Sequence, residues 1–555
     1  MIEANWITCT SLLVEKCRTL SQLKQIHANL LKLNVSQIPA AIAPLVSFTV
    51  ASCNPVFFSH ARAVFQNLRH RSTFLYNTMI RGYVQSNLPI FAILCYKDML
   101  RDGLIKNNYT FTPLMKACSM ILGDVRCMGL LTHAHVLKLG FCCDLFVVSA
   151  LIEFYALKHD MGRAHMLFDE MPVKDVVLWT AMIDGYGKMG NVEKAREYFD
   201  EMPERNVVSW SALMAAYSRV SDFKEVISLY RNMEDMGLKP NQSIIVSALT
   251  ACAHLGALAQ GLWIHSYAKR CKYSLNPIIA TALVDMYSKC GALELAFTVF
   301  NGIRNKDSGV WNAIISCAAM NGVEMKSLEL LDSMITYGAQ PTEATFVVVL
   351  TACSHAKLVE KGLSLFKKMD SVYEIKPRIE HYACIVDLLA RSGKLEEAEI
   401  YVDEIMCDIG ERDANIWGAL LGACRNYGNI EIGDRVWKKI ADGGEIDYGI
   451  RVLAYNMYKE AGWEAEAKSI RKLIDERPAN KKSGCSLIEV HGMVEEFHAG
   501  DLSHPQAEEI FGLISLFKTQ KNISYVRSTL VITTMRYLNL HSGFSFLWFI
   551  PRSTY

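Results

Sequence analysis

The residues of this chain that could do chemistry are its cysteines and histidines. The sequence of 555 residues holds 17 Cys and 15 His. No two cysteines stand in a C-x-x-C pattern, which is the usual spacing of zinc and redox cysteines. His133 and His135 have a metal-like spacing, but they lie in a helical stretch where a packing role is expected. No phosphate-binding loop or nucleophile elbow occurs. The sequence therefore predicts no catalytic residue, no metal site and no cofactor.

Some of the cysteines recur at one place in a repeated Ala-Cys step. The four steps are Ala117-Cys118, Ala251-Cys252, Ala352-Cys353 and Ala423-Cys424. A thiol that recurs in this way is most simply a small, buried, apolar side chain. The lack of a paired cysteine framework points to a reducing compartment and away from secretion.

A packing unit recurs along the chain and indicates how the elements are arranged. It consists of a small residue, an aromatic or aliphatic residue four positions on, and a Met or aliphatic residue three positions further. The clearest copies are Ala164-Phe168-Met171 and Ala195-Phe199-Met202; looser copies begin at Ala61, Ala92, Val226, Ala296, Ser327, Gly362 and Ala398, and the variants Gly129-His133 and Gly261-His265 fill the two large gaps. Successive copies begin 31 to 37 residues apart, a period that indicates a stacked array.

Composition agrees with such an array. A chain of 555 residues is too long for one ordinary hydrophobic core, whereas in a solenoid each unit packs only on its neighbours. The hydrophobic fraction of 51% suits units that are buried on two sides. The net charge of +1 excludes a strong global attraction to nucleic acid. No apolar stretch reaches the roughly 18 residues of a membrane-spanning helix, so no membrane contact is predicted.

Each unit reads as two helices, most clearly at residues 176–206. Trp179, Met182 and Tyr186 share one helical face, Gly190 marks a turn, and Pro203 ends the second helix. The predicted fold class is therefore all-α, a solenoid of helix-turn-helix units with a small C-terminal extension.

The chain is expected to divide into five segments. Residues 1–60 are predicted to form a degenerate N-terminal capping repeat with a weak transit segment, 61–413 about ten tandem repeats, 414–478 two degenerate helical pairs, 479–515 an extension with a short hairpin, and 516–555 an atypical tail rich in aromatic residues.

The units resemble pentatricopeptide repeats, in the plant PLS type that alternates long, ordinary and short copies. The short copies VVLWTAMIDGYGKMGNVEKAREYFDEMPERN and PIIATALVDMYSKCGALELAFTVFNGIRNKD carry this likeness. NIWGALLGACRNYGNIEIGD and SGCSLIEVHGMVEEFHAGDLSHPQAEEI resemble the E/E+ region that follows such repeats. The resemblance covers about residues 10–515. It implies a right-handed α-solenoid of pentatricopeptide repeats without a complete DYW deaminase domain.

The resemblance further implies that each unit faces one base of single-stranded RNA with two side chains. One is the residue after the aromatic or aliphatic anchor of the first helix, and the other is the last residue of the unit. The candidate pairs are Asn77 with Asn107, Ser149 with Asp175, Thr180 with Asn206, Ser211 with Asn241, Thr281 with Asp307, and Asn312 with Thr342. All of them are small and polar and can hydrogen-bond a base edge, which apolar Val177 and Val208 would flank.

A plainer explanation of these residues is that small polar side chains cap helices or cover a solvated face.

By analogy with the family code, Thr or Ser with Asn indicates adenine, and Thr or Ser with Asp indicates guanine. Asn77 with Asn107 indicates a pyrimidine, and Val246 and Val347 mark long repeats that contribute little. The predicted RNA for residues 73–307 is pyrimidine, any, G, A, A, any, G.

Many relatives continue into a cytidine deaminase domain, which needs H-x-E and P-C-x-x-C to hold its zinc and its acid/base glutamate. Neither pattern occurs in this chain. The resemblance therefore implies a non-enzymatic factor that recognises sites of C-to-U editing in organelle RNA. Its expected partners are that RNA, a trans-acting DYW-type deaminase and other editing factors, with residues 414–515 as the docking surface.

Two alternatives stay open. One is a factor that stabilises or helps to splice organelle RNA without editing it. The other is a protein-binding scaffold of the tetratricopeptide kind, whose repeat is a steadier length of about 34 residues. The mixed spacings of 31, 35 and 36 residues argue against the second. Family frequency favours the mitochondrion as the location, with the plastid as the alternative.

Overall fold

The computed structural model describes residues 10–498, apart from positions 12, 18, 34, 53, 122–125, 272, 274–275, 410–413, 442–445, 476–484 and 491–492. The chain forms two compact units, Met1–Asp222 with Met233–Lys239, and Phe223–Asn232 with Pro240–Tyr555. The predictions for residues 499–515 and for the tail 516–555 lie outside the described residues.

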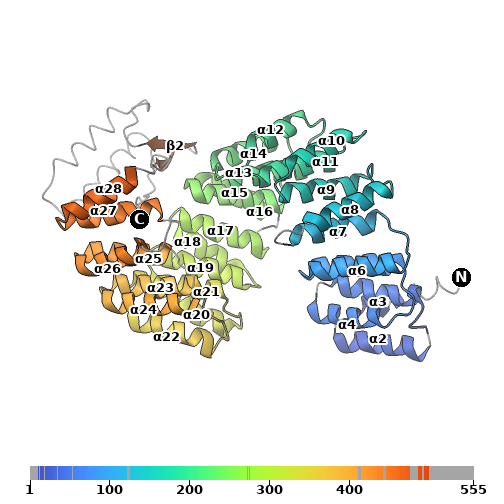
Figure 1. The fold of residues 1–555 in the computed structure, drawn as a ribbon, viewed down its shortest axis with the longest axis horizontal. Helices are drawn as coiled ribbons and strands as arrows, with labels where there is room; N and C mark the ends of the chain where they lie inside the picture. The colour runs from blue at the N-terminus through green and yellow to red at the C-terminus, as the bar shows by residue number, and fades with distance from the viewer. Residues whose placement is uncertain are drawn as a thin grey trace. The chain divides into compact units, whose positions relative to one another are not determined.

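Helices joined by short turns make up the first unit (Figure 1). They are α2 (Leu20–Lys32), α3 (Pro39–Ala51), α4 (Pro55–Gln66), α5 (Thr73–Gln85), α6 (Pro89–Arg101), α7 (Asn108–Met120), α8 (Arg126–Lys138), α9 (Leu145–Leu157), α10 (Met161–Glu170), α11 (Val176–Lys188), α12 (Val192–Glu201) and α13 (Val207–Arg219). Helix α4 crosses position 60, at which the N-terminal segment was expected to end. The next helix, α14 (Phe223–Asp235), has residues in both units.

Further helices and one hairpin make up the second unit. They are α15 (Gln242–Leu255), α16 (Leu258–Arg270), α17 (Pro277–Lys289), α18 (Leu293–Gly302), α19 (Ser308–Met320), α20 (Glu324–Tyr337), α21 (Glu343–His355), α22 (Val359–Ser371), α23 (Ile379–Arg391), α24 (Leu395–Ile409), α25 (Ala414–Tyr427), α26 (Ile430–Ala441), α27 (Tyr448–Glu460), α28 (Glu464–Asp475), β1 (Cys485–Val490) and β2 (Met493–His498).

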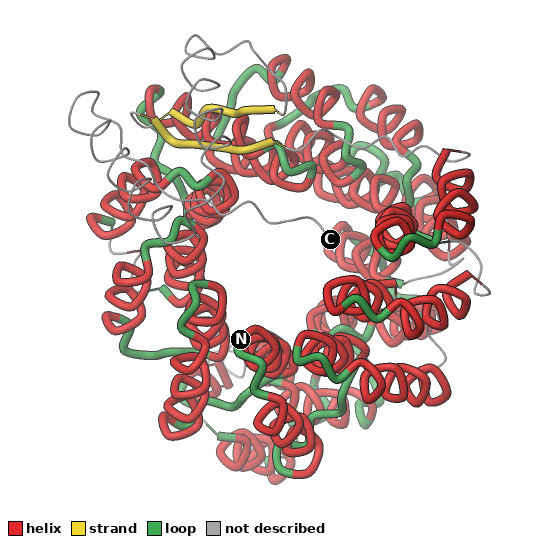
Figure 2. Tube along the Cα trace, turned by 90° about the vertical axis from the view of Figure 1, so that its left-hand side faces the viewer, coloured by secondary structure: helices red, strands yellow, loops and turns green. Residues whose placement is uncertain are grey.

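Within each unit the helices form two layers (Figure 2). The odd-numbered helices, which open each repeat, pack side by side: α9, α11 and α13 in the first unit, and α15, α17 and α19 in the second. The even-numbered helices α4 to α12 and α16 to α28 each pack on the helix before them. This arrangement confirms the predicted all-α solenoid of helix-turn-helix repeats.

The uneven spacing of the repeats comes from the length of the second helix. Helices α10, α12 and α18 have 10 residues each, whereas α14 has 13 and α20 has 14. Each short helix ends at a C-cap residue with extended backbone, namely Met171, Met202 and Ile303. All three side chains are buried. In the short repeats the second helix therefore stops at this buried apolar residue. In the longer repeats the second helix continues for another turn.

Aromatic pairs fill the seams between a short repeat and the longer repeat that follows it. The rings of Phe199 and Trp210 meet edge to face with centroids 4.8 Å apart, and Phe300 and Trp311 repeat this geometry at 4.8 Å. The guanidinium of Arg205 lies 5.1 Å from the centre of the Phe199 ring. These contacts confirm that the aromatic residue of the recurring unit packs against the neighbouring repeat.

In the glycine-histidine variants of the packing unit, the glycine leaves room for a large side chain of the next repeat. A Cβ atom on Gly129 would lie 2.0 Å from the Phe154 ring, and one on Gly261 would lie 2.5 Å from the Met286 sulfur. Glycine at these positions is therefore required by close packing with the next repeat. The Ala-Cys steps fit the same pattern, because Cys118, Cys252, Cys353 and Cys424 are all buried.

His133 and His135 have structural roles in the packing of neighbouring repeats. His133 Nδ1 lies 2.6 Å from the Tyr155 hydroxyl, and His135 Nδ1 lies 3.0 Å from the Tyr96 hydroxyl. The first contact reaches the following repeat and the second the preceding one. Burial lowers the pKa of His133, which favours the neutral ring. The two imidazoles thus bind different tyrosines.

The predicted hairpin is present, and it packs on repeats far away in the sequence. Strands β1 and β2 pair antiparallel, with Cys485 opposite His498. The Glu489 carboxylate accepts hydrogen bonds from the backbone N–H of Ala259 at 3.0 and 3.2 Å. The N-cap residue of α16, Ala257, has no side chain that could accept this bond. Glu489 therefore caps α16 from outside its own repeat.

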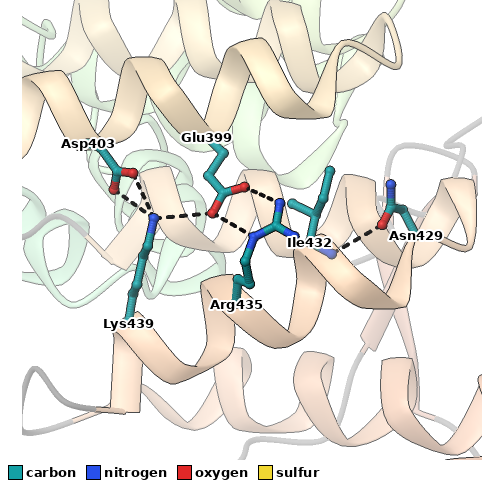
Figure 3. Close-up of polar contacts among 6 residues, drawn as sticks. All are labelled: Glu399, Asp403, Asn429, Ile432, Arg435 and Lys439. Atoms are coloured by element: carbon teal, nitrogen blue, oxygen red, sulfur yellow. Dashed lines mark hydrogen bonds and ion pairs between the residues drawn. The ribbon is translucent and has the colours of Figure 1, made fainter.

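Ion pairs join the second helices α24 and α26 (Figure 3). Glu399 accepts from Arg435 at 2.7 Å and from Lys439 at 3.1 Å, and Lys439 also reaches Asp403 at 2.7 Å. Nearby, Asn429 accepts the N–H of Ile432 at 3.1 Å and caps α26. Hydrogen bonds from Arg435 hold the pKa of Glu399 below its ordinary value, although burial acts in the opposite direction.

Replacing Phe199 with alanine should lower the free energy of unfolding by about 3–5 kcal/mol, because the ring is 3% exposed and its loss leaves a cavity in a seam. Thermal or urea denaturation followed by circular dichroism measures this change. Phe74→Ala is the matched control, since that ring is 54% exposed. An effect of Phe199→Ala no larger than that of the control contradicts the packing assignment.

Replacing Glu399 with glutamine should lower the melting temperature at neutral pH. A carboxylate whose pKa is lowered in the folded protein stabilises it above the ordinary pKa, and this stabilisation disappears as the pH falls through the folded pKa. The difference in melting temperature between wild type and Glu399→Gln should therefore shrink below about pH 4.5. A difference that does not change with pH contradicts the ion-pair account; Glu464→Gln, on an exposed pair, is the control.

Candidate nucleic-acid interface

A cavity of about 440 Å³ opens on the layer of first helices in the first unit. Residues of α9, α11 and α13 line it, together with the residue that caps α13. Four of the predicted RNA-binding residues are among them, namely Ser149, Thr180, Asn206 and Ser211. The structure thus brings candidates from three successive repeats to one concave surface.

The twelve candidates occupy two fixed places in the repeat. The first member of each pair is the fifth residue of its helix: Asn77 in α5, Ser149 in α9, Thr180 in α11, Ser211 in α13, Thr281 in α17 and Asn312 in α19. The second member is the N-cap of the next first helix: Asn107, Asp175, Asn206, Asn241, Asp307 and Thr342. None of the twelve is fully buried, and Asn206 and Asp307 are exposed. Ser211 belongs to the first compact unit and Asn241 to the second.

The plainer explanation is correct in part, because the second members do cap helices. Asn206 Oδ1 accepts from the backbone N–H of Val208 at 2.9 Å and of Ser209 at 3.0 Å. Asp175 Oδ1 accepts from Leu178 at 2.9 Å in the same way. These bonds use one oxygen of the side chain. Capping therefore fixes the orientation of the group, so that the Nδ2 amide of Asn206 or the second oxygen of Asp175 can meet a base.

The two threonines among the first members are also anchored to their own helix. Thr180 Oγ1 donates to the carbonyl of Val176 at 2.7 Å, and Thr281 Oγ1 donates to that of Pro277 at 2.9 Å. A hydroxyl that has donated its proton keeps acceptor lone pairs. These two residues are thus oriented as acceptors for an N–H of a base.

The Asn-containing pairs at the two ends differ, because their members bond each other. Asn77 Nδ2 donates to Asn107 Oδ1 at 2.9 Å, and Asn312 Nδ2 donates to Thr342 Oγ1 at 3.2 Å. Thr110 donates to Asn77 Oδ1 at 2.7 Å, which further fixes the first pair. The predicted partners therefore do meet in space. A base can reach these side chains by replacing or sharing those hydrogen bonds.

Exposed apolar side chains flank the polar groups. Val177 and Val208, each the second residue of its helix, line the cavity and are 46% and 56% exposed. The sequence reasoning overlooked that the same place in other repeats carries exposed apolar residues as well: Phe74, Tyr109, Phe146 and Ile278. Their common position at the start of the first helix was the signal that could have identified them. Side chains of this kind can contact the faces of bases.

Charged residues form a ladder along one edge of the cavity. Lys188 lies 2.7 Å from Asp184 and 3.4 Å from Glu153, and Arg219 lies 3.2 Å from Asp184. No sequence pattern singles out these cations, because their contacts with Glu153 and Asp184 join three successive helices. They place positive charge beside the polar and apolar groups, and the carboxylates partly neutralise it. Such a surface suits a single strand with phosphates at its edge.

The described part of the chain lacks two other classes of site. No group of His, Cys, Asp or Glu side chains there is arranged to hold a metal ion. No helix there has both the length and the apolar character that crossing a membrane requires.

Comparisons with known proteins converge on one repeat family. The model described as PPR repeat matches residues 177–207, 208–238, 278–308, 309–338 and 344–372, and the model described as PPR repeat family matches residues 71–120. The matched segments include the helices that line the cavity on α11 and α13.

Relatives from Arabidopsis thaliana match most of the chain. Pentatricopeptide repeat-containing protein At5g66520 is 43% identical over 498 residues, which is 90% of this chain and 79% of that protein. Pentatricopeptide repeat-containing protein ELI1, chloroplastic, is 40% identical and is covered over 81% of its length by 94% of this chain. Pentatricopeptide repeat-containing protein At2g22410, mitochondrial, is also 40% identical, with 83% of this chain and 67% of that protein covered.

A solved structure shares the fold. The crystal structure of the pentatricopeptide repeat protein PPR10 from maize aligns with 85% of this chain and 79% of its own, with a TM-score of 0.51 and 18% sequence identity.

Proposed function

The chain belongs to the pentatricopeptide repeat family, and on that premise we propose that it binds single-stranded RNA by sequence. Repeats of this family can each face one base and read it with two or three side chains. The observation that carries the proposal is the cavity on α9, α11 and α13, which Thr180 and Asn206 line together with exposed Val177 and Val208. Each base enters between two apolar side chains and meets the two polar groups.

The polar pairs set the base preference in this proposal. Thr180 with Asn206 selects adenine, because a capped asparagine presents a fixed amide to the base edge. Thr281 with Asp307 selects guanine, because a carboxylate accepts from base N–H donors. Asn77 with Asn107 selects a pyrimidine. The ladder of Lys188 and Arg219 meets the phosphates and carries no sequence information.

We further propose that the protein recognises sites of C-to-U editing in organelle transcripts, with a DYW-type deaminase supplied in trans. The proposal is supported by the E/E+-like residues after the repeats, which continue as α25 to α28 and the hairpin. Relatives named as mitochondrial and as chloroplastic support an organelle as the location. Residues 414–515 would include the partner's docking surface, and the described outer helices α26 and α28 are part of that region.

An alternative within the same family is an RNA stabilisation or splicing factor. The same cavity would serve it, so the choice between the two depends on the transcript that is affected. The tetratricopeptide scaffold loses its support, because the matched repeat models are those of pentatricopeptide repeats.

Replacing Asn206 with aspartate should move base preference from A to G at one position. Asp caps a helix as well as Asn does, so the stability of α13 should be unchanged while the group facing the base becomes an acceptor. Fluorescence anisotropy with RNAs that carry A or G at the fourth position of the predicted core measures the preference, with an expected reversal of roughly 5- to 100-fold per position.

Asn206→Ala is the control for this exchange, since it removes both the cap and the amide. A base preference that Asn206→Asp leaves unchanged, in a protein whose melting temperature is also unchanged, would show that Asn206 is a cap and nothing more.

Loss of the gene should leave one or a few organelle cytidines unedited while other sites are edited normally. Sequencing of mitochondrial and plastid transcripts measures this. Unchanged editing together with altered splicing or transcript abundance would assign the protein to the alternative role.

A further inference from the structure

A second and larger cavity, of about 640 Å³, opens in the second unit on the face of α23, α25 and α27. Its lining includes Asp387 and Arg391 from α23, Gly418 and Gly422 from α25, and Asp447 at the start of α27. It lies beyond the repeats that hold the predicted pairs of base-reading residues.

The two cavities are built from the same positions of the repeat. Gly418 is the fifth residue of α25, as Thr180 is of α11, and Gly422 is the ninth, as Asp184 is. Asp447 is the N-cap of α27, as Asn206 is of α13. The cavity in the second unit is therefore the equivalent, on its own first helices, of the cavity proposed to hold a base.

The residue types differ in a way that alters what can be recognised. The fifth position of α25 is a glycine, so that place has no side chain to bond a base edge. Asp447 Oδ1 accepts from the N–H of Gly449 at 2.7 Å, which makes it a cap like Asn206. Small residues on α25 thus leave room for a base of either size without selecting between them.

An aromatic ring, that of Tyr427, lines the cavity beside these small residues. Tyr427 is 49% exposed, and its hydroxyl donates to the backbone carbonyl of Arg391 at 2.7 Å. The ring also rests on the turn at Gly393, where an added Cβ would lie 3.3 Å from ring atoms. Tyr427 is therefore held in place before any ligand arrives, as a platform on which a base can stack.

Cations line the same cavity. Arg391 Nε lies 2.8 Å from Asp387, which leaves the outer N–H donors of its guanidinium for other partners. Lys357 also lines the cavity. Two cations and an aromatic ring in one cavity suit a nucleotide, because the base can stack on the ring and the cations can bind the phosphate.

We propose that this cavity binds one further nucleotide of the same RNA strand, whatever its base, by stacking on Tyr427 with Arg391 and Lys357 on the phosphate. The inference rests on the proposed RNA-binding function. If one repeat serves one nucleotide, the repeat that begins with α25 is the fourth after the repeat that begins with α17. The nucleotide it binds is then the fourth beyond the G read by Thr281 and Asp307.

The test uses the full chain and three RNAs: the predicted core of seven bases, the core extended by six uridines beyond its last G, and the same extended RNA with an abasic residue at the fourth added position. Fluorescence anisotropy at fixed salt should show that the abasic change weakens binding by about 5- to 100-fold, the range for loss of one base–aromatic stack. Tyr427→Ala should weaken binding of the intact extended RNA equally, add nothing to the abasic loss, and leave the core RNA unaffected.

Tyr337→Ala is the matched control, because Tyr337 is also 49% exposed and also donates to a backbone carbonyl, that of Arg304, at 2.7 Å. It should leave all three affinities unchanged. Tyr427→Phe, which keeps the ring but loses the hydrogen bond, should bind like wild type and so separates stacking from a fault in folding.

Three results would overturn the proposal. If the protein binds the core RNA and the abasic change does not weaken binding of the extended RNA, the proposed subsite is wrong but the proposed function stands. If wild-type protein binds neither the core nor the extended RNA above background, both the proposed function and the proposed subsite are wrong. Tyr427→Ala that leaves every RNA affinity unchanged but weakens binding of a deaminase domain assigns the cavity to a protein partner.

Discussion

Within each unit, the structure depends on the close stacking of one repeat on the next. In the short repeats, small residues such as Ala164 and Ala195 are fully buried, and edge-to-face pairs such as Phe199 with Trp210 fill the seams. Where a larger neighbour must fit, as at Gly261 against Met286, the small residue becomes glycine. This stacking brings residues of successive helices to the same face of the layer. Without it, Ser149, Thr180 and Ser211 would share no surface.

Capping links this scaffold to recognition. A residue at the N-cap is held by the backbone of the helix that it begins, so its remaining polar atoms have a defined direction. Asn206, Asp175 and Asp307 all satisfy this condition. Helix capping and base reading are therefore compatible uses of one side chain, and the cap supplies the preorganisation that reading a base requires.

Much of the fold could be predicted from the sequence because it is encoded locally. Helical spacing around Trp179, the turn at Gly190 and the alternation at 485–498 all depend on near neighbours. The positions of the candidate pairs followed from the resemblance to pentatricopeptide repeats. What could not be predicted depends on contacts between distant segments. The ion pair of Asp184 with Arg219 joins two helices, and Asn77 bonds Asn107 across a whole repeat. Glu489 caps a helix some 230 residues earlier. No local pattern marks such contacts in advance.

The central claim is that the polar pairs read RNA in order. The most direct measurement is the affinity of the purified protein for the RNA pyrimidine, any, G, A, A, any, G and for scrambled RNAs of the same composition, at one salt concentration. The account predicts that the ordered RNA binds more than about tenfold tighter, a difference of about 1.4 kcal/mol. Equal affinities, with the same dependence on salt, would mean that the surface binds phosphate and not sequence, and would contradict the account.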